Sequence, residues 1–233
     1  MNHFSTWPEV KNVEIAFLPI GSLEQHGYHL PIAADSIIAE AIAHECAKRF
    51  DHSFVCPVLP YSASFEHAGF PGSISLQSIT IIMVVKDIIR SLERMGVDKI
   101  VMINGHGGNY LLGNIAQEMN VDHSRILLAP SRKHWEKAYE QAGISAAPSR
   151  DMHAGEGETS ILMYLDEALV RMEQRVDVDS PERDLLTACG IKPYTETGAI
   201  GFPTRASADK GRILLQALGE QISMTVRKFM EGT

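Results

Sequence analysis

The stretch Gly21–Asp35 constrains the fold and the chemistry of this chain more than any other segment. It follows Val13–Ile20, a mostly apolar run that is typical of a buried strand. It precedes Ser36–Phe50, whose apolar residues repeat at helical spacing. Two carboxylates and two imidazoles lie in this stretch, at Glu24, His26, His29 and Asp35. A strand that leads into a helix through such a loop favours an α/β sheet, in which ligands bind at the C-terminal ends of the strands.

The rest of the chain continues this alternation of strands and helices. We expect further strands at Ser53–Leu59, Lys99–Ile103 and Arg125–Ala129. We expect further helices at Ser75–Met95, Tyr110–Met119, Lys133–Ala142, from about Gly155 onwards, and at Ser207–Phe229. The segment 171–204 is rich in proline and shows little periodicity. The pattern predicts a single α/β domain over residues 1–233, with a mainly parallel sheet, helices on both faces and three layers.

Composition excludes several classes of function. The formal net charge of −8 and the lack of a basic cluster disfavour nucleic-acid binding. The longest apolar run, Ile79–Val85, is shorter than the roughly 18 residues that a membrane-spanning helix needs. Three cysteines without a CxxC pair fit a reducing compartment, and no signal peptide is evident at the N-terminus. We therefore expect a cytoplasmic protein that acts on a small molecule.

The Gly21–Asp35 loop has the composition of a metal site. Carboxylate oxygen and imidazole nitrogen together form the usual ligand set for zinc, manganese or iron. Glu24 and His26 are two positions apart, so in an extended segment their side chains point the same way. An alternative is that Asp35 only caps the following helix and that Glu24 is a surface charge.

A second candidate loop, N-G-H-G-G-N at Asn104–Asn109, follows the strand predicted at Lys99–Ile103. Glycines let another group approach the backbone closely, and His106 stands in their centre. A glycine-rich turn before a helix can instead hold an anion, and His106 can be a buried structural histidine. The central histidine favours a metal ligand.

A third candidate loop, D-M-H-A-G-E-G-E-T-S at Asp151–Ser160, contains His153, Glu156 and Glu158 just before an apolar helix. Acidic residues in a first helical turn are often only partners of the helix dipole, and Thr159 or Ser160 can supply the cap.

These loops resemble motifs of the creatininase (creatinine amidohydrolase) family. The matching pieces are L-P-I-G-S-L-E-Q-H-G-Y-H-L-P-I-A-A-D, N-G-H-G-G-N, H-A-G-E-G-E-T-S and, more weakly, G-A-I-G-F-P-T-R-A-S-A-D-K-G at 198–211. The resemblance implies a parallel α/β sheet, a pair of divalent metals at its C-terminal edge and a homohexamer. It also implies hydrolysis of a non-peptide or terminal C–N bond. The N-G-H-G-G-N version resembles the branch with formylaminopyrimidine deformylases and a peptidase of redox-cofactor synthesis, rather than creatininase proper.

The resemblance also assigns roles to residues. Glu24 and His106 would bind one metal, His26 the other, and Asp35 both. Creatininase proper has a metal-binding glutamate where this chain has Gly108, and Glu158 is our candidate replacement. His153 matches a family histidine that acts on the substrate or shuttles protons, and Glu156 is the alternative proton donor. We expect the substrate to be surrounded by His29, His67, Gly107 and Gly108.

The sequence therefore predicts an amidohydrolase that cleaves a cyclic amide or formamide-type C–N bond with a water activated by two metals. One alternative uses the same metal site for another hydrolysis, or for isomerisation of a cyclic ketone or sugar derivative. A second alternative is a non-catalytic module that binds a metal, or a phosphate at Gly105–Asn109.

Overall fold

Four parallel strands form the central sheet of the computed structural model, which describes residues 1–232. Their order across the sheet is β2 (Ser53–Val55), β1 (Ile15–Ile20), β3 (Lys99–Asn104) and β4 (Ile126–Ala129). All six residues of β1 are buried, as expected for a parallel strand with helices on both sides. Ile20 at the end of β1 is in register with Asn104 at the end of β3, so the loops that follow start side by side.

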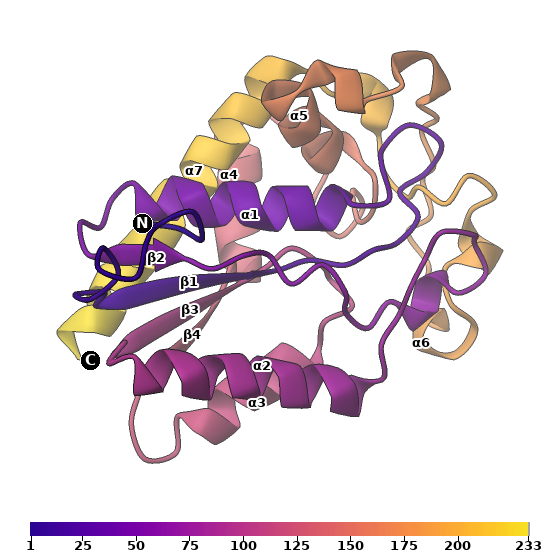
Figure 1. Ribbon diagram of the computed structural model, residues 1–233. Helices are drawn as coiled ribbons and strands as arrows, with labels where there is room; N and C mark the ends of the chain where they lie inside the picture. The colour runs from indigo at the N-terminus through magenta and orange to yellow at the C-terminus, as the bar shows by residue number, and fades with distance from the viewer. Residues whose placement is uncertain (233) are drawn as a thin grey trace.

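Helices cover both faces of this sheet and give the three predicted layers (Figure 1). One face carries α1 (Ala34–Ala47), α4 (Arg132–Gln141), α5 (Glu156–Leu165) and α7 (Ala208–Glu231). The other carries α2 (Ser78–Arg94) and α3 (Leu111–Met119). Each face of the sheet has its own hydrophobic core. Neighbouring residues of β1 pack into the two cores alternately, with Phe17 on the α1 side and Leu18 on the α2 side. The parallel α/β fold predicted from the sequence is confirmed.

Some element boundaries differ from the prediction for clear physical reasons. The strand expected to reach Leu59 ends at Val55, two residues before Pro57, which has no backbone N–H for the ladder. The alternative reading of Asp35 as a helix cap is wrong, because Ala33 precedes α1 without a side-chain cap and Asp35 lies in the first turn. The final helix begins as expected, with Ser207 Oγ accepting from the backbone N–H of Lys210.

The segment 171–204, which showed little periodicity, contains only short helical turns. They are η3 (Met172–Gln174), α6 (Leu186–Cys189), η4 (Lys192–Tyr194) and the start of η5 (Pro203–Arg205). In Figure 1 the α6 region lies at the opposite end of the molecule from the two termini. Within residues 1–232, no helix combines the length and the apolar character needed to cross a membrane.

The contact between α5 and α7 offers a direct test of this packing. A Cβ at Gly211 of α7 would overlap the backbone carbonyl of Ser160 in α5, so we expect Gly211→Ala to lower the free energy of unfolding by about 2–3 kcal/mol. Gly113→Ala in α3 is the matched control, since a Cβ there meets no atom within 4 Å. It should stabilise the helix by about 0.5–1 kcal/mol. Chemical denaturation of both variants measures the difference, and equal stabilities would contradict the packing described.

Candidate metal centre

The three loops identified in the sequence meet at the C-terminal edge of the sheet. Two glycines permit this approach: a Cβ at Gly21 would overlap the backbone of Ser36, and one at Gly105 would overlap the backbone carbonyl of Asp35. The loops after β1 and β3 can therefore lie directly against the first turn of α1. Carboxylates and imidazoles that are far apart in the sequence converge there as a result.

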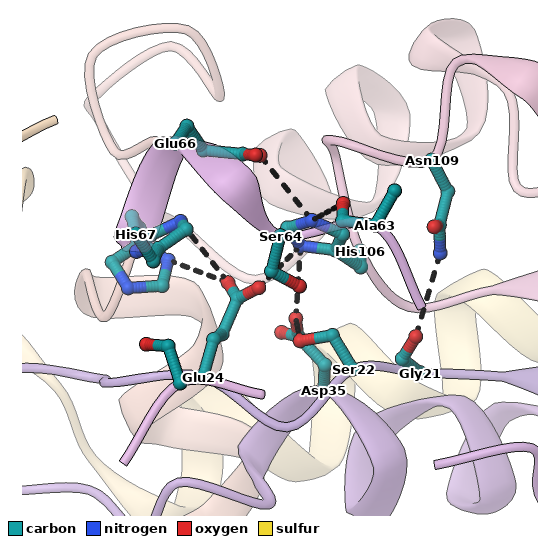
Figure 2. A network of polar contacts seen from close by, with 12 residues as sticks. Gly21, Ser22, Glu24, Asp35, Ala63, Ser64, Glu66, His67, His106 and Asn109 are labelled. Carbon is teal, nitrogen blue, oxygen red and sulfur yellow. Dashed lines mark hydrogen bonds and ion pairs between the residues drawn. The ribbon is translucent and has the colours of Figure 1, made fainter. Parts of the chain in front are cut away.

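Two overlapping groups of metal-ligand type share Asp35. In the first, His106 Nδ1 lies 3.2 Å from Glu24 Oε2 and 3.1 Å from Asp35 Oδ2. In the second, His26 Nε2 lies 2.9 Å from Asp35 Oδ1 and 3.9 Å from Glu158 Oε2. The donor atoms within each group lie within 4.8 Å of one another. Asp35 thus offers one oxygen to each group, and Figure 2 shows Glu24 and Asp35 pointing toward His106.

Hydrogen bonds to backbone carbonyls orient the rings of His26 and His153, so that the second nitrogen of each ring faces a carboxylate. His26 Nδ1 donates to the backbone carbonyl of Glu24 at 3.1 Å, which in the neutral ring leaves the lone pair of Nε2 facing Asp35. His153 Nε2 donates to the backbone carbonyl of Gln25 at 2.7 Å, which leaves Nδ1 at 3.6 Å from Glu24 Oε1. Lone pairs and carboxylate oxygens facing one another are the arrangement that a bound cation stabilises.

Glu24 gives a second sign that the cluster fits a cation. Its carboxylate is completely buried, and within residues 1–232 neither oxygen has a hydrogen-bond partner of good geometry, although His67 Nε2 and His106 Nδ1 each lie 3.2 Å from one of them. A buried carboxylate without such a partner is costly, and metal coordination is one of the few ways to compensate it. The residues present therefore fit a divalent metal site.

The protonation of the cluster follows from its crowding. Burial acts to lower the pKa of His26, but Asp35, Glu158 and Glu24 outweigh it and raise the pKa to about 10. Burial acts to raise the pKa of Asp35, but His26 and His106 hold it well below its usual value. Burial raises the pKa of Glu158 to about 8, against the opposing effect of His26. Protons and metal ions thus compete for the same ligand atoms, and metal loading should release protons.

Beside the cluster lies a cavity of about 180 Å³ that reaches several of the expected substrate-binding residues. His67, Gly107, Gly108 and His153 line it together with Asp35 and Glu158. His67 Nδ1 accepts from the side-chain amide of Gln25 at 2.9 Å, and its Nε2 lies 3.2 Å from Glu24 Oε1. His153 also belongs to a third ligand-type group, with Glu24 and His26.

Two predicted site residues lie elsewhere. The Glu156 carboxylate forms a buried ion pair with Lys210 of α7 and is not among the residues that line the cavity. His29 is buried behind the cluster, 3.0 Å from Thr159 Oγ1, and burial together with His26 lowers its pKa to about 4. Their catalytic and substrate-binding roles stay predictions.

Capping of α5 does not involve the residues considered from the sequence. The backbone N–H groups of Glu156 and Gly157 donate to the carboxylate of Asp151, and Thr159 bonds to His29. The reading of Thr159 or Ser160 as the cap is therefore wrong, and Asp151 takes that function from outside the helix.

Sequence reasoning missed two residues of the site. The buried side-chain amide of Gln25 donates to His67 Nδ1 and to the backbone carbonyl of Gly198 at 3.0 Å, and the backbone carbonyl of Gln25 accepts from His153 Nε2. Its place between Glu24 and His26 was the available signal. The second is Glu66, which follows Phe65 in a short helical turn. It approaches Nε2 of His106, on the side of the ring opposite to Glu24 (Figure 2).

Comparison with known proteins identifies the family of the chain. Residues 3–226 match the creatininase (creatinine amidohydrolase) family. The chain belongs to the creatininase family. Like other members it is an enzyme, a hydrolase of the creatinine amidohydrolase type.

Individual members of the creatininase family resemble the chain over most of its length. It is 32% identical to the mycofactocin precursor peptide peptidase of Mycobacterium tuberculosis (strain CDC 1551 / Oshkosh), over 91% of this chain and 84% of the relative. It is 27% identical to the creatinine amidohydrolase of Pseudomonas putida, over 92% of this chain and 89% of the relative. A crystal structure of creatininase superimposes with a TM-score of 0.85 at 24% identity, covering 97% of this chain and 96% of the other, which supports the fold.

Proposed function

We propose that this protein is a divalent-metal amidohydrolase that cleaves a C–N bond of a small cyclic amide or formamide-type substrate. Two family relatives carry names that describe amide hydrolysis, an amidohydrolase and a peptidase. The observation that carries the proposal is the position of Asp35, whose two oxygens face two different groups of ligands. A carboxylate shared in this way could serve two metal ions that lie close together.

The ligand assignment follows from these groups. Glu24, His106 and one oxygen of Asp35 would hold the first metal, and His26, Glu158 and the other oxygen of Asp35 the second. Mixed imidazole and carboxylate ligands accept zinc, manganese or iron. Bound there, two divalent cations would lower the pKa of a water molecule and polarise the substrate carbonyl.

The chain itself supplies the proton transfer. His153 lines the cavity, and its Nδ1, 3.6 Å from Glu24 Oε1, carries the lone pair of the neutral ring because Nε2 donates to the Gln25 carbonyl. Burial, together with His26 and His67, keeps the pKa of His153 well below its usual value, so the ring is neutral. Nδ1 can therefore take a proton from the attacking water and give it to the leaving nitrogen, which is a poor leaving group until it is protonated.

The surroundings of the Gly105–Asn109 turn argue against the phosphate-binding alternative. His106 in this turn faces Glu24, Asp35 and Glu66, all within 3.3 Å of its ring nitrogens. Carboxylates gathered at this point repel an anion and attract a cation.

The proposal is tested by assaying the protein loaded separately with Zn²⁺, Mn²⁺ or Fe²⁺. The panel contains creatinine, an aryl formamide, a short peptide and a cyclic ketone, with chelator-treated protein as control. We expect metal-dependent release of an amine from at least one amide. Hydrolysis of the ketone without turnover of any amide would contradict amide hydrolysis, and metal binding without any turnover would favour a binding module.

Glu158 provides a sharper test of the ligand assignment. Glu158→Gln replaces a charged ligand by a neutral amide, so we expect the affinity for one of two metals to fall by more than about 100-fold. Glu156→Gln, two residues earlier on α5 and paired with Lys210, is the matched control and should retain both metals. Metal analysis after gel filtration measures the content per chain. Full metal content in Glu158→Gln would show that another residue is the ligand.

Two further properties stay predictions. The resemblance implies a homohexamer, which sedimentation velocity can measure. A cytoplasmic location agrees with the cysteines of the chain, which are all free: Cys46 and Cys56 are buried and Cys189 is exposed.

A further inference from the structure

The two ring nitrogens of His106 face different surroundings. Nδ1 faces the carboxylates of Glu24 and Asp35, on the side of the proposed first metal. Nε2 faces away from it, toward the backbone carbonyl of Ala63 at 3.2 Å and Glu66 Oε1 at 3.3 Å. Figure 2 shows Glu66 reaching His106 from the turn η1 (Phe65–His67), across from Glu24. A proton on Nε2 that is held by these two acceptors leaves the lone pair on Nδ1, where a metal needs it.

The carboxylate of Glu66 also occupies the space that a side chain at position 108 would take. A Cβ built on Gly108 would overlap both Glu66 Oε1 and His106 Nε2. A residue with a side chain at position 108 therefore excludes Glu66 from its present position. The neighbouring Gly107 differs, since a Cβ there meets no atom within 4 Å. The departure from creatininase proper at Gly108 thus has a structural counterpart in the placement of Glu66.

Glu66 lies between the cavity beside the metal-ligand cluster and a larger neighbouring groove. Its backbone carbonyl accepts from the N–H of Ile191 at 2.9 Å, which joins η1 to the segment after α6. The side chain is about three-quarters buried and lines the cavity of about 180 Å³ beside the cluster. It also lines a larger adjoining groove of about 720 Å³, as do Gly108 and Leu186. The carboxylate therefore separates the ligand histidine from the open groove.

We propose that Glu66 is a positioning residue that holds His106 in the tautomer and orientation needed for the first metal, and that Gly108 is required because it leaves room for Glu66. This inference rests on the proposed metal site.

The test measures Zn²⁺ affinity by competition with a chromophoric chelator, with no assay of activity. We expect Glu66→Ala to weaken one of two Zn²⁺ dissociation constants by about 10- to 100-fold, the effect typical of losing the hydrogen-bond partner of a ligand histidine. The affected dissociation constant should belong to the proposed first metal, and Glu24→Gln should therefore weaken the same constant. Glu66→Gln should lose less affinity than Glu66→Ala, because its amide oxygen still accepts from His106 Nε2.

Gly108 completes a double-mutant cycle. Gly108→Ala should weaken the same constant at least as much as Glu66→Ala, because its Cβ overlaps both the Glu66 carboxylate and the ring of His106. The double variant should lose no more than Gly108→Ala alone, since the contact between Glu66 and His106 is already lost in Gly108→Ala. Gly113→Ala, with open space around the added methyl group, is the control that should bind Zn²⁺ like the wild type. Thermal melts establish that each variant is folded.

The results separate this inference from the proposed function. Wild-type protein that binds no Zn²⁺ would contradict the metal site itself. Two Zn²⁺ ions bound to the wild type, with unchanged affinity in Glu66→Ala, would overturn only the role of Glu66. Equal losses in Glu66→Gln and Glu66→Ala, or additive losses in the double variant, would also overturn it.

Discussion

Replacing Asp35 by alanine is expected to remove both metals from the protein and to lower kcat/KM by about 10⁴-fold or more. Asp35 Oδ1 lies 2.9 Å from His26 Nε2 and Oδ2 lies 3.1 Å from His106 Nδ1, so the substitution takes a ligand from each group. Without metals, the attacking water keeps a pKa of about 15.7 instead of about 7. Metal analysis together with amide hydrolysis measures both effects.

Asp209→Ala is a suitable control for this variant, because Asp209 is exposed in the first turn of α7 and pairs only loosely with Arg212. It should retain wild-type metal content and activity. Circular dichroism establishes whether Asp35→Ala is folded. If folded Asp35→Ala keeps one metal at wild-type affinity, Asp35 serves a single ion, and the shared-ligand arrangement is wrong.

Replacing His153 by asparagine is expected to lower kcat by about 10²- to 10⁴-fold, the usual contribution of a general acid or base, while both metals remain bound. The reason is that His153 lines the cavity and that Nδ1 of its neutral ring can accept a proton. Steady-state kinetics on the best amide substrate and metal analysis of the same preparation measure the two quantities.

The matched control is His123→Asn, which changes an exposed histidine in the loop before β4 and should leave kcat unchanged. His153 also lies within ligand distance of Glu24 and His26, so a second role has to be distinguished. Loss of a metal from His153→Asn would make His153 a ligand. Unchanged kcat with both metals bound would exclude it from proton transfer.

The convergence of the proposed ligand residues was predictable because it depends on topology. Glu24 follows β1, and His106 follows β3, its parallel neighbour, so both lie at the same edge of the sheet. The alternation of apolar strands and amphipathic helices was sufficient to predict this arrangement. The sequence also located Asp35 and Glu158 at helix starts that face the same edge, although it could not distinguish a ligand from a helix cap.

The remaining features depend on contacts between segments that sequence patterns do not relate. Glu156 has the same appearance in the sequence as Glu158, but the two lie on different sides of α5, and Lys210 of α7 pairs with Glu156 rather than with Glu158. Glu66 lies in a loop without periodicity, and its approach to His106 depends on the missing side chain of Gly108. Such pairings are set by tertiary packing, so only the folded structure could identify them.

The most direct test of the shared metal site is anomalous X-ray diffraction from crystals of the protein loaded with Zn²⁺ or Mn²⁺. We expect two peaks, one on each side of the Asp35 carboxylate. The first should lie beside Glu24 and His106, and the second beside His26 and Glu158. A single peak, or two peaks without Asp35 between them, would contradict the site described above.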